Sequence, residues 1–290
     1  MSKAVPVIPR KGPYLGLDGE IPKYWFGGDP FKTRLFDALS LVFPEGEKFF
    51  ITCVRDYKDQ IKDPKLAEEV KHFTFQEGQH SMVHRLYNEH LLKQGIDPGF
   101  VDKRFQRVFG NLRRFSPKWF TLASTAAIEH LTATFSHALL EGGEKWSEAD
   151  PRLRAMFAWH CIEEFEHRSV AFDVMEKVAK VGYLGRTGVM VWVSFTFQMH
   201  IFAIMRRMLI NDGFSARERK KIWSDGMKWL YGRDGFFTIA LPTYLSFLKP
   251  GFHPEDTVAP GGYDRWLQEY EKTGDAMIAG DIAMGLGKAA

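Results

Sequence analysis

The sequence predicts an all-α fold, a four-helix bundle around a two-metal core followed by additional C-terminal helices. Apolar residues recur at helical spacing in four long segments, and no segment has a convincing strand pattern. Two of these segments contain a Glu-x-x-His pair, Glu77 with His80 and Glu164 with His167. The helical segment before each pair carries a lone glutamate in its apolar stripe.

The spacing of these residues fits a metal site. On a helix, residues three apart lie on one face, so a Glu and a His can reach the same metal ion. Four carboxylates and two imidazoles in this order are the ligand set of di-iron and di-manganese bundles. We expect two metal ions, with the carboxylates of the two pairs as bridging ligands. The predicted ligands are Glu47, Glu77, His80, Glu129, Glu164 and His167.

A further imidazole precedes the second pair. His160 lies four residues before Glu164, so both side chains and His167 share one helix face. We expect His160 to be a third imidazole ligand, and the alternative is a residue that hydrogen-bonds to a ligand.

Other polar residues near the motifs have weaker cases. Glu45 lies about two residues off the apolar stripe, so Glu47 is the preferred ligand on that helix. The candidates for hydrogen bonding to the ligands are His84 and His130, with ordinary core histidines as the alternative. Glu163 and Glu166 lie off the ligand face and are expected to be solvated or paired.

The four helices are predicted from apolar residues at helical spacing and from the Pro and Gly residues that begin and end helices. Residues 1–30 are rich in Pro and Gly and predict an extended arm that packs through Tyr24-Trp25-Phe26. Proline is tolerated at a first helical turn, and glycine pairs end helices. The expected helices span about 31–61 (with a break near Pro44), 64–94, 116–142 and 150–180, with a short helix within 97–116.

The expected bundle covers residues 31–182, and residues 183–290 form a helical extension that covers it. Helices are expected near 215–231, 236–247 and 266–273, with a frayed end. Residues 189–205, VMVWVSFTFQMHIFAIM, are at the lower length limit for a membrane span and contain Gln198 and His200. A buried central helix is the preferred interpretation, and a helix that contacts a membrane surface is the alternative.

Composition narrows the function classes. The net charge is only +3, from 39 basic and 36 acidic residues, and the basic run 217–221 has no interleaved aromatic residues. We therefore expect no nucleic-acid partner. Cys53 and Cys161 lie in apolar contexts without metal spacing, and the N-terminus lacks the apolar core of a signal peptide. The expected location is cytoplasmic, with membrane association open.

Several blocks resemble a known bacterial family. Residues 24–57, YWFGGDPFKTRLFDALSLVFPEGEKFFITCVRDY, are similar to the start of the family described as "predicted metal-dependent hydrolase". FQEGQHSMVHRLYNEHL, WHCIEEFEHRSVAFDV and LKPGFHPED resemble its other blocks, so the resemblance covers about residues 22–256. It implies a ferritin-like bundle. The run from His160 to His167 is also similar to the extra-histidine site of di-iron arylamine N-oxygenases.

Three functions compete. A di-iron oxygenase or oxidase is preferred because helical, glutamate-rich ligation suits redox metals. It would use two Fe ions (Mn or mixed Mn/Fe as alternatives, Zn less favoured), O2, an electron donor and an apolar or aromatic small substrate. The alternatives are a two-metal hydrolase of an ester, amide or phosphoester, and a non-enzymatic metal-binding bundle. A homodimer is a further possibility.

Overall fold

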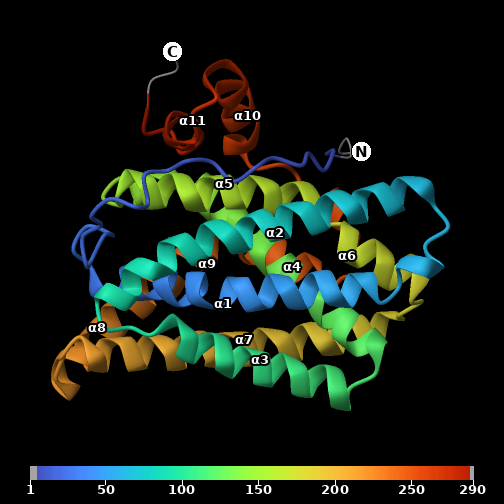
Figure 1. Ribbon diagram of the computed structural model, residues 1–290, viewed down its shortest axis with the longest axis horizontal. Coiled ribbons are helices and arrows are strands. Elements are labelled where there is room, and N and C mark those ends of the chain that lie inside the picture. Colours follow the sequence, from blue (N-terminus) through green and yellow to red (C-terminus); the bar gives the residue numbers. More distant parts are fainter. Residues whose placement is uncertain (1–4, 288–290) are drawn as a thin grey trace.

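The computed structural model describes residues 5–287, so the first four residues of the predicted arm and the last three of the extension lie outside it. Regular structure in the described residues is helical, apart from one antiparallel bridge between Phe26 and Ala149. Figure 1 shows long helices lying roughly parallel to the long axis, with two short C-terminal helices above them. The all-α prediction is confirmed.

Four long helices form the bundle that holds the predicted ligands. α1 packs on α2 and α4 on α5, and contacts of α1 with α4 and of α2 with α5 close the ring. In three of the four, an Asp side chain accepts a backbone N–H at the N-terminus and Pro occupies the first turn, which are favourable start signals. The bounds are α1 Pro30–Arg55, α2 Pro64–Lys93, α4 Lys118–Glu141 and α5 Pro151–His167.

Some helix limits differ from the prediction. α1 ends at Arg55 rather than near residue 61, because the chain reverses before α2, and Pro44 stays inside the helix. The short helix expected within 97–116 is the 18-residue α3, Pro98–Phe115. The predicted fourth helix is interrupted after His167 and continues as α6, Val170–Asp173, and a π-helical turn.

The C-terminal third adds five helices to the outside of the bundle. α7 packs on α1 and α4, α9 on α4, and α11 on α5. The expected frayed end is wrong for α11, whose Gly280 lies so close to Ala155 that an added Cβ would meet its Cα at 3.2 Å. The bounds are α7 Tyr183–Asn211, α8 Ala216–Tyr231, α9 Phe236–Ser246, α10 Gly261–Thr273 and α11 Ala276–Ala283.

α7 is not the buried helix that its hydropathy predicts. It is the one helix in residues 5–287 that is long and apolar enough to cross a membrane by length and composition. Only 39% of its most apolar 18-residue window is buried. The side that faces α1 and α4 is covered, and the opposite side is exposed, because no described element packs there.

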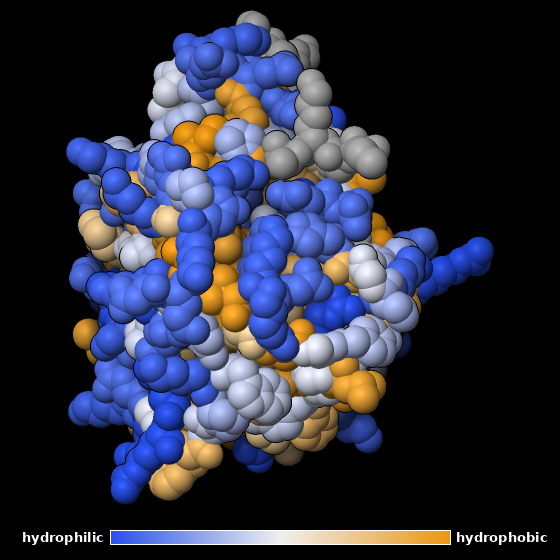
Figure 2. All heavy atoms as spheres, turned by 90° about the vertical axis from the view of Figure 1, so that its right-hand side faces the viewer, coloured by the Kyte–Doolittle hydropathy of each residue, from blue (hydrophilic) through white to orange (hydrophobic). Residues whose placement is uncertain are grey.

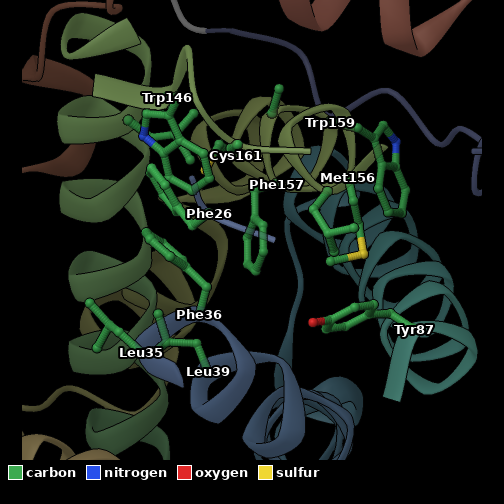
Figure 3. Close-up of a cluster of buried hydrophobic side chains, with 14 of the residues drawn as sticks. Phe26, Leu35, Phe36, Leu39, Tyr87, Trp146, Met156, Phe157, Trp159 and Cys161 are labelled. Atoms are coloured by element: carbon green, nitrogen blue, oxygen red, sulfur yellow. The ribbon is translucent and has the colours of Figure 1, made fainter. Parts of the chain in front are cut away.

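Aromatic side chains fill one end of the bundle core. The Phe36 ring on α1 lies 4.5 Å from Trp146 and 5.1 Å from Phe157, measured between ring centroids. Figure 3 shows Phe26 of the arm beside Trp146 and Phe36. Trp25 and Phe26 are buried, so the arm packs on the body as expected. Cys53 and Cys161 are buried free thiols.

A buried ion network ties the arm, α1, α2 and the end of α7 together. Arg34 donates to Asp37 at 2.6 Å and to Asp212 at 2.8 Å, and the three side chains are fully buried. Asp37 also accepts hydrogen bonds from Trp25 Nε1 (3.0 Å) and from the Tyr87 hydroxyl. Removing Arg34 therefore leaves the buried carboxylate of Asp37 without its positive partner.

We predict that Arg34→Ala lowers the free energy of unfolding by about 3–5 kcal/mol, the usual effect of breaking a buried ion pair from one side. Urea denaturation followed by circular dichroism measures it. Lys221→Ala is the control, because Lys221 pairs with Asp225 on the surface of α8, and no measurable change is expected. Equal effects of the two substitutions would contradict a structural role for the network.

Candidate metal centre

The structure brings the six predicted ligands together in the bundle core. All six side chains are buried, and they come from four different helices. α1 contributes Glu47, α2 contributes the first Glu-x-x-His pair, α4 contributes Glu129, and α5 contributes the second pair. The apolar stripes point these polar residues inward, since they occupy positions that otherwise carry core residues.

His167 lies at the centre of one half of the cluster. Its Nε2 is 3.2 Å from a carboxylate oxygen of Glu77, 3.3 Å from Glu129 and 3.5 Å from Glu164. Glu77, Glu164 and His167 form a group in which one potential ligand atom per residue lies within 4.8 Å of the others, as binding of a single cation requires.

The second half gathers around His80 and His160. His80 Nδ1 is 3.6 Å from Glu164 Oε1, and His160 Nε2 is 3.0 Å from the same oxygen. Glu47 forms a group with Glu77 and His80 in which one potential ligand atom per residue lies within 4.8 Å of the others. Glu77 and Glu164 take part in groups on both sides, which is the arrangement expected of bridging carboxylates.

Unsatisfied polar atoms test whether this cluster fits metal ions. Buried polar groups in folded proteins are nearly always hydrogen-bonded, because burial without a partner costs free energy. Here both carboxylate oxygens of Glu77 and of Glu129 have no hydrogen-bond partner, and neither do Glu47 Oε1, Glu164 Oε2, His80 Nδ1 and His167 Nε2. These eight atoms belong to predicted ligands, and the other unpartnered buried atoms in the described residues are single atoms on His137, Trp146, Arg168, Trp266 and Glu269. Oxygen and nitrogen atoms of this kind are metal ligands, so the residues fit the predicted ions.

The protonation of the cluster reflects its crowded negative charge. Burial raises the pKa of Glu47 well above its usual range, and the charge of Glu77 adds to the effect. Burial likewise raises the pKa of Glu129 well above its usual range. Burial lowers the pKa of His167, but Glu164 and Glu129 outweigh it, and the net pKa is raised well above its usual value. The carboxylates thus require a cation at this point, which either an imidazolium proton or a metal ion supplies.

The two Glu-x-x-His helices hold each other's histidine. His80 on α2 donates from Nε2 to Glu163 of α5 at 3.1 Å. His167 on α5 donates from Nδ1 to Gln76 of α2 at 2.9 Å. Glu163 and Gln76 each immediately precede the Glu of their own motif, so the exchange is reciprocal. It leaves His80 Nδ1 and His167 Nε2 free to bind metal, since the partner of the other ring nitrogen fixes the tautomer.

Sequence reasoning missed this supporting layer. Glu163 and Glu166, which could have been solvated, are both buried and paired. Arg10 of the arm contacts Glu166 at 2.8 Å and Glu163 at 3.5 Å. Gln76 Nε2 also donates to Glu166 at 2.9 Å. The sequence does contain one sign of this layer. A polar residue, Gln76 or Glu163, directly precedes the Glu of each motif.

A second hydrogen-bonded chain orients His160. The Ser40 hydroxyl donates to Asn88 Oδ1 at 2.8 Å, so its oxygen accepts from His84 Nδ1–H at 2.9 Å. His84 Nε2 then accepts from His160 Nδ1–H at 2.7 Å. His160 Nε2 lies 3.0 Å from Glu164 Oε1 and is the ring nitrogen that a metal ion would use. His84 therefore lies where a residue that supports a ligand is expected.

His130 does not lie in the cluster. Its Nε2 is 3.0 Å from the carbonyl oxygen of Thr243 and 3.3 Å from that of Tyr244, both on α9. Consecutive residues on a helix point about 100° apart, so the neighbour of the inward Glu129 faces the adjacent helix instead. The expectation that His130 supports a ligand is wrong.

Two apolar cavities reach the cluster from one side. The first, of about 440 Å3, lies among α1, α3, α4 and α7 and touches Glu47, His160 and Glu164. The second, of about 470 Å3, lies among α1, α4, α5, α7 and α9 and touches His160 and Glu164. Phe43, Thr132 and Phe197 line both, so the cavities adjoin at the cluster.

The fold and the cluster together define an all-helical protein with buried Glu and His residues that can bind metal in its core. The chain belongs to the family described as "Predicted metal-dependent hydrolase", whose model matches residues 11–257. No curated protein and no solved structure matches the chain.

Glu47 and Glu45 are both buried on α1, so substituting each one tests whether Glu47 binds metal or is merely a buried glutamate. We predict that Glu47→Gln raises the Tm of the chelator-treated protein by about 2–4 °C, which corresponds to roughly 1 kcal/mol in a chain of this size. The reason is that burial and the charge of Glu77 make the Glu47 carboxyl costly to place in the core, as its raised pKa shows, and a neutral amide avoids that cost. The same variant should bind Mn²⁺ or Fe²⁺ more weakly, measured by titration calorimetry.

The matched control is Glu45→Gln. Glu45 is also buried on α1, but it pairs with Arg85 at 3.0 Å and lies outside the cluster. It should leave metal binding unchanged and should not raise the Tm. If Glu45→Gln weakens metal binding as much as Glu47→Gln does, the ligand choice on α1 is wrong.

Proposed function

We propose that the protein is a dinuclear metalloenzyme that oxidises an apolar substrate with O2. The observation that supports this proposal is a carboxylate-rich donor set in a helical core, with apolar cavities that lead to it. Glu47, Glu77, His80, Glu129, Glu164 and His167 would hold the two ions, and His160 would add a third imidazole. Bound iron would supply redox chemistry toward O2, and an electron donor would provide the reducing equivalents.

The protein's own residues have separate tasks in this proposal. Gln76 and Glu163 orient the two motif histidines, and His84 orients His160. The apolar residues that line both cavities, Phe43 and Phe197, exclude water from the reacting centre. A substrate in either cavity lies against His160 and Glu164, so the reacting atoms would meet on that side of the cluster.

Hydrolysis is the second candidate, and the family description favours it. Two adjacent metal ions can lower the pKa of a bound water molecule and clamp an ester, amide or phosphoester. The same ligands would serve, but zinc or manganese would suffice and no electron donor would be needed. The two candidates therefore differ in metal, in O2 dependence and in product.

Metal analysis combined with O2 exposure distinguishes them. We predict that protein purified from iron-supplemented cells holds about two Fe per chain, as a ligand set of this type does. Anaerobic reduction followed by O2 should change the optical spectrum, and Glu77→Ala should abolish the change. Protein that holds only zinc, shows no spectral change with O2 and cleaves ester or phosphoester substrates would contradict the oxidative proposal and support hydrolysis.

Gly46 gives a test of the cavities. It lies beside Glu47 inside α1 and lines the first cavity, although glycine in a helix interior costs about 1 kcal/mol relative to alanine. An added Cβ would meet only Phe50 Cζ, at an ordinary 3.8 Å. We predict that Gly46→Leu folds but fills the cavity and weakens binding of a fluorescent long-chain fatty acid by at least about tenfold, the scale of steric discrimination in apolar pockets.

Gly110→Leu is the control for that experiment. Gly110 lies inside α3, an added Cβ there would meet nothing within 4 Å, and the residue lines neither cavity. It should bind the probe like the unaltered protein. Unchanged probe affinity in Gly46→Leu would show that the first cavity is not the binding site.

A further inference from the structure

The outer side of α7 is an apolar surface of unusual length. Phe195 is 71% exposed, and large apolar side chains follow one another along the helix at three- and four-residue spacing. α7 contains no acidic residue. Exposed large apolar residues along its middle and N-terminal half include Leu184, Val191, Trp192, Phe195 and Met199.

Neighbouring elements extend this surface. α9 adds exposed apolar residues on one side, and Tyr244 of α9 bonds to Ser194 of α7 at 3.0 Å. The end of α3 and the start of α4 add aromatic residues on the other side, where Trp192 lies 5.2 Å from Phe120. The additional exposed residues are Ile239, Leu241, Leu245, Phe115 and Trp119. We call this whole set the α7 face.

The α7 face lies along one edge of the molecule. Figure 1 shows α3 and α7 side by side at the lower edge, away from α10 and α11. Figure 2 shows the end of the molecule that lies on the right in Figure 1. On this end, hydrophilic atoms dominate, and apolar atoms show in smaller groups between them. Contiguous exposed apolar surface of this kind marks an interaction site.

Positive charge accompanies the face. α3 and α7 together contain eight basic residues and one acidic residue, whereas the whole chain has 39 and 36. The single acidic residue, Asp102, pairs with Arg85. The two helices are in direct contact, since Arg104 donates to His200 at 3.0 Å and Arg207 lies over the Phe100 ring. Apolar and aromatic residues beside basic residues are the composition that binds anionic lipid surfaces.

Both cavities open onto this face. Phe115 and Trp192 line the first cavity and are also exposed, so they stand at its mouth. Tyr231 and Leu241 have the same double position in the second cavity. A molecule that leaves a lipid layer at the α7 face therefore has an apolar path to His160 and Glu164.

We propose that the α7 face docks on an anionic lipid bilayer and that the two cavities take up a substrate with a long hydrocarbon chain from it. The docking is inferred from the α7 face alone, whereas the substrate class also rests on the proposed function. α7 lies on the bilayer rather than across it, because its other side packs on α1 and α4. Helices bound in this way bury one apolar face at the level of the acyl chains.

Vesicle flotation tests the docking with the full chain. The protein should float with vesicles of phosphatidylcholine mixed with phosphatidylglycerol, and less with phosphatidylcholine alone. Phe195→Glu should lower the bound fraction at least about tenfold, because a carboxylate at acyl-chain depth is costly. Lys103→Gln combined with Arg107→Gln should remove the preference for the anionic vesicles.

Phe75→Glu is the matched control, since Phe75 is also an exposed phenylalanine, on α2. It should float like the unaltered protein, and circular dichroism should show that all variants are folded. Absence of flotation, or equal loss in both Phe→Glu variants, would overturn the proposal. So would light scattering that shows a dimer which Phe195→Glu dissociates, because the face would then be covered by a second copy.

Flotation needs neither metal nor turnover, so its result is independent of the proposed function. A protein that floats but binds no Fe²⁺ or Mn²⁺ in titration calorimetry would leave the docking intact and remove the oxidative function. For the substrate class, fluorescent fatty acid should pass from vesicles to the unaltered protein but not to Phe195→Glu. Transfer that is equally fast in both proteins would overturn uptake through the docked face.

Discussion

Four carboxylates share a few ångströms of the bundle core, and their mutual repulsion is the constraint on which the rest of the structure depends. Burial strengthens this repulsion because the interior screens charge poorly. A cation among the carboxylates offsets it, and the raised pKa of His167, in which Glu164 and Glu129 outweigh burial, expresses the same need. The helices supply rigid positions for the donors, and a layer of hydrogen-bonded residues holds the imidazoles in the tautomers that a cation requires.

The sequence predicts the donors well and their supports poorly, for a physical reason. Glu77, His80, Glu164 and His167 are visible because helical periodicity alone decides which residues share a face. Gln76 and Glu163 lie one position off that face, and their role depends on how α2 and α5 are rotated against each other. Arg10 comes from an arm without periodicity, so its contact with Glu166 follows only from the folded chain.

α7 and α11 show the same limit at the level of whole helices. The segment 189–205 has apolar residues on every side, and hydropathy does not say which side another helix covers. In the folded chain α1 and α4 cover one side only. Gly280 weakens the helix propensity of α11 relative to alanine, yet it allows the helix to approach Ala155 closely. Tertiary contacts therefore decide both cases, and these contacts lie beyond local pattern.

The centre has two unlike sides, and only one of them is reached by the cavities. The side of Gln76 and Glu163 is closed by the arm, whose Arg10 neutralises buried carboxylates there. His160 and Glu164 face the opposite side, where the cavities are almost wholly apolar and end at α7. Apart from the centre's own Glu47, His160 and Glu164, the path in front of it is lined mainly by apolar side chains. A substrate that fits this path is itself poorly soluble in water, and it would gather in the lipid layer that the α7 face is proposed to contact.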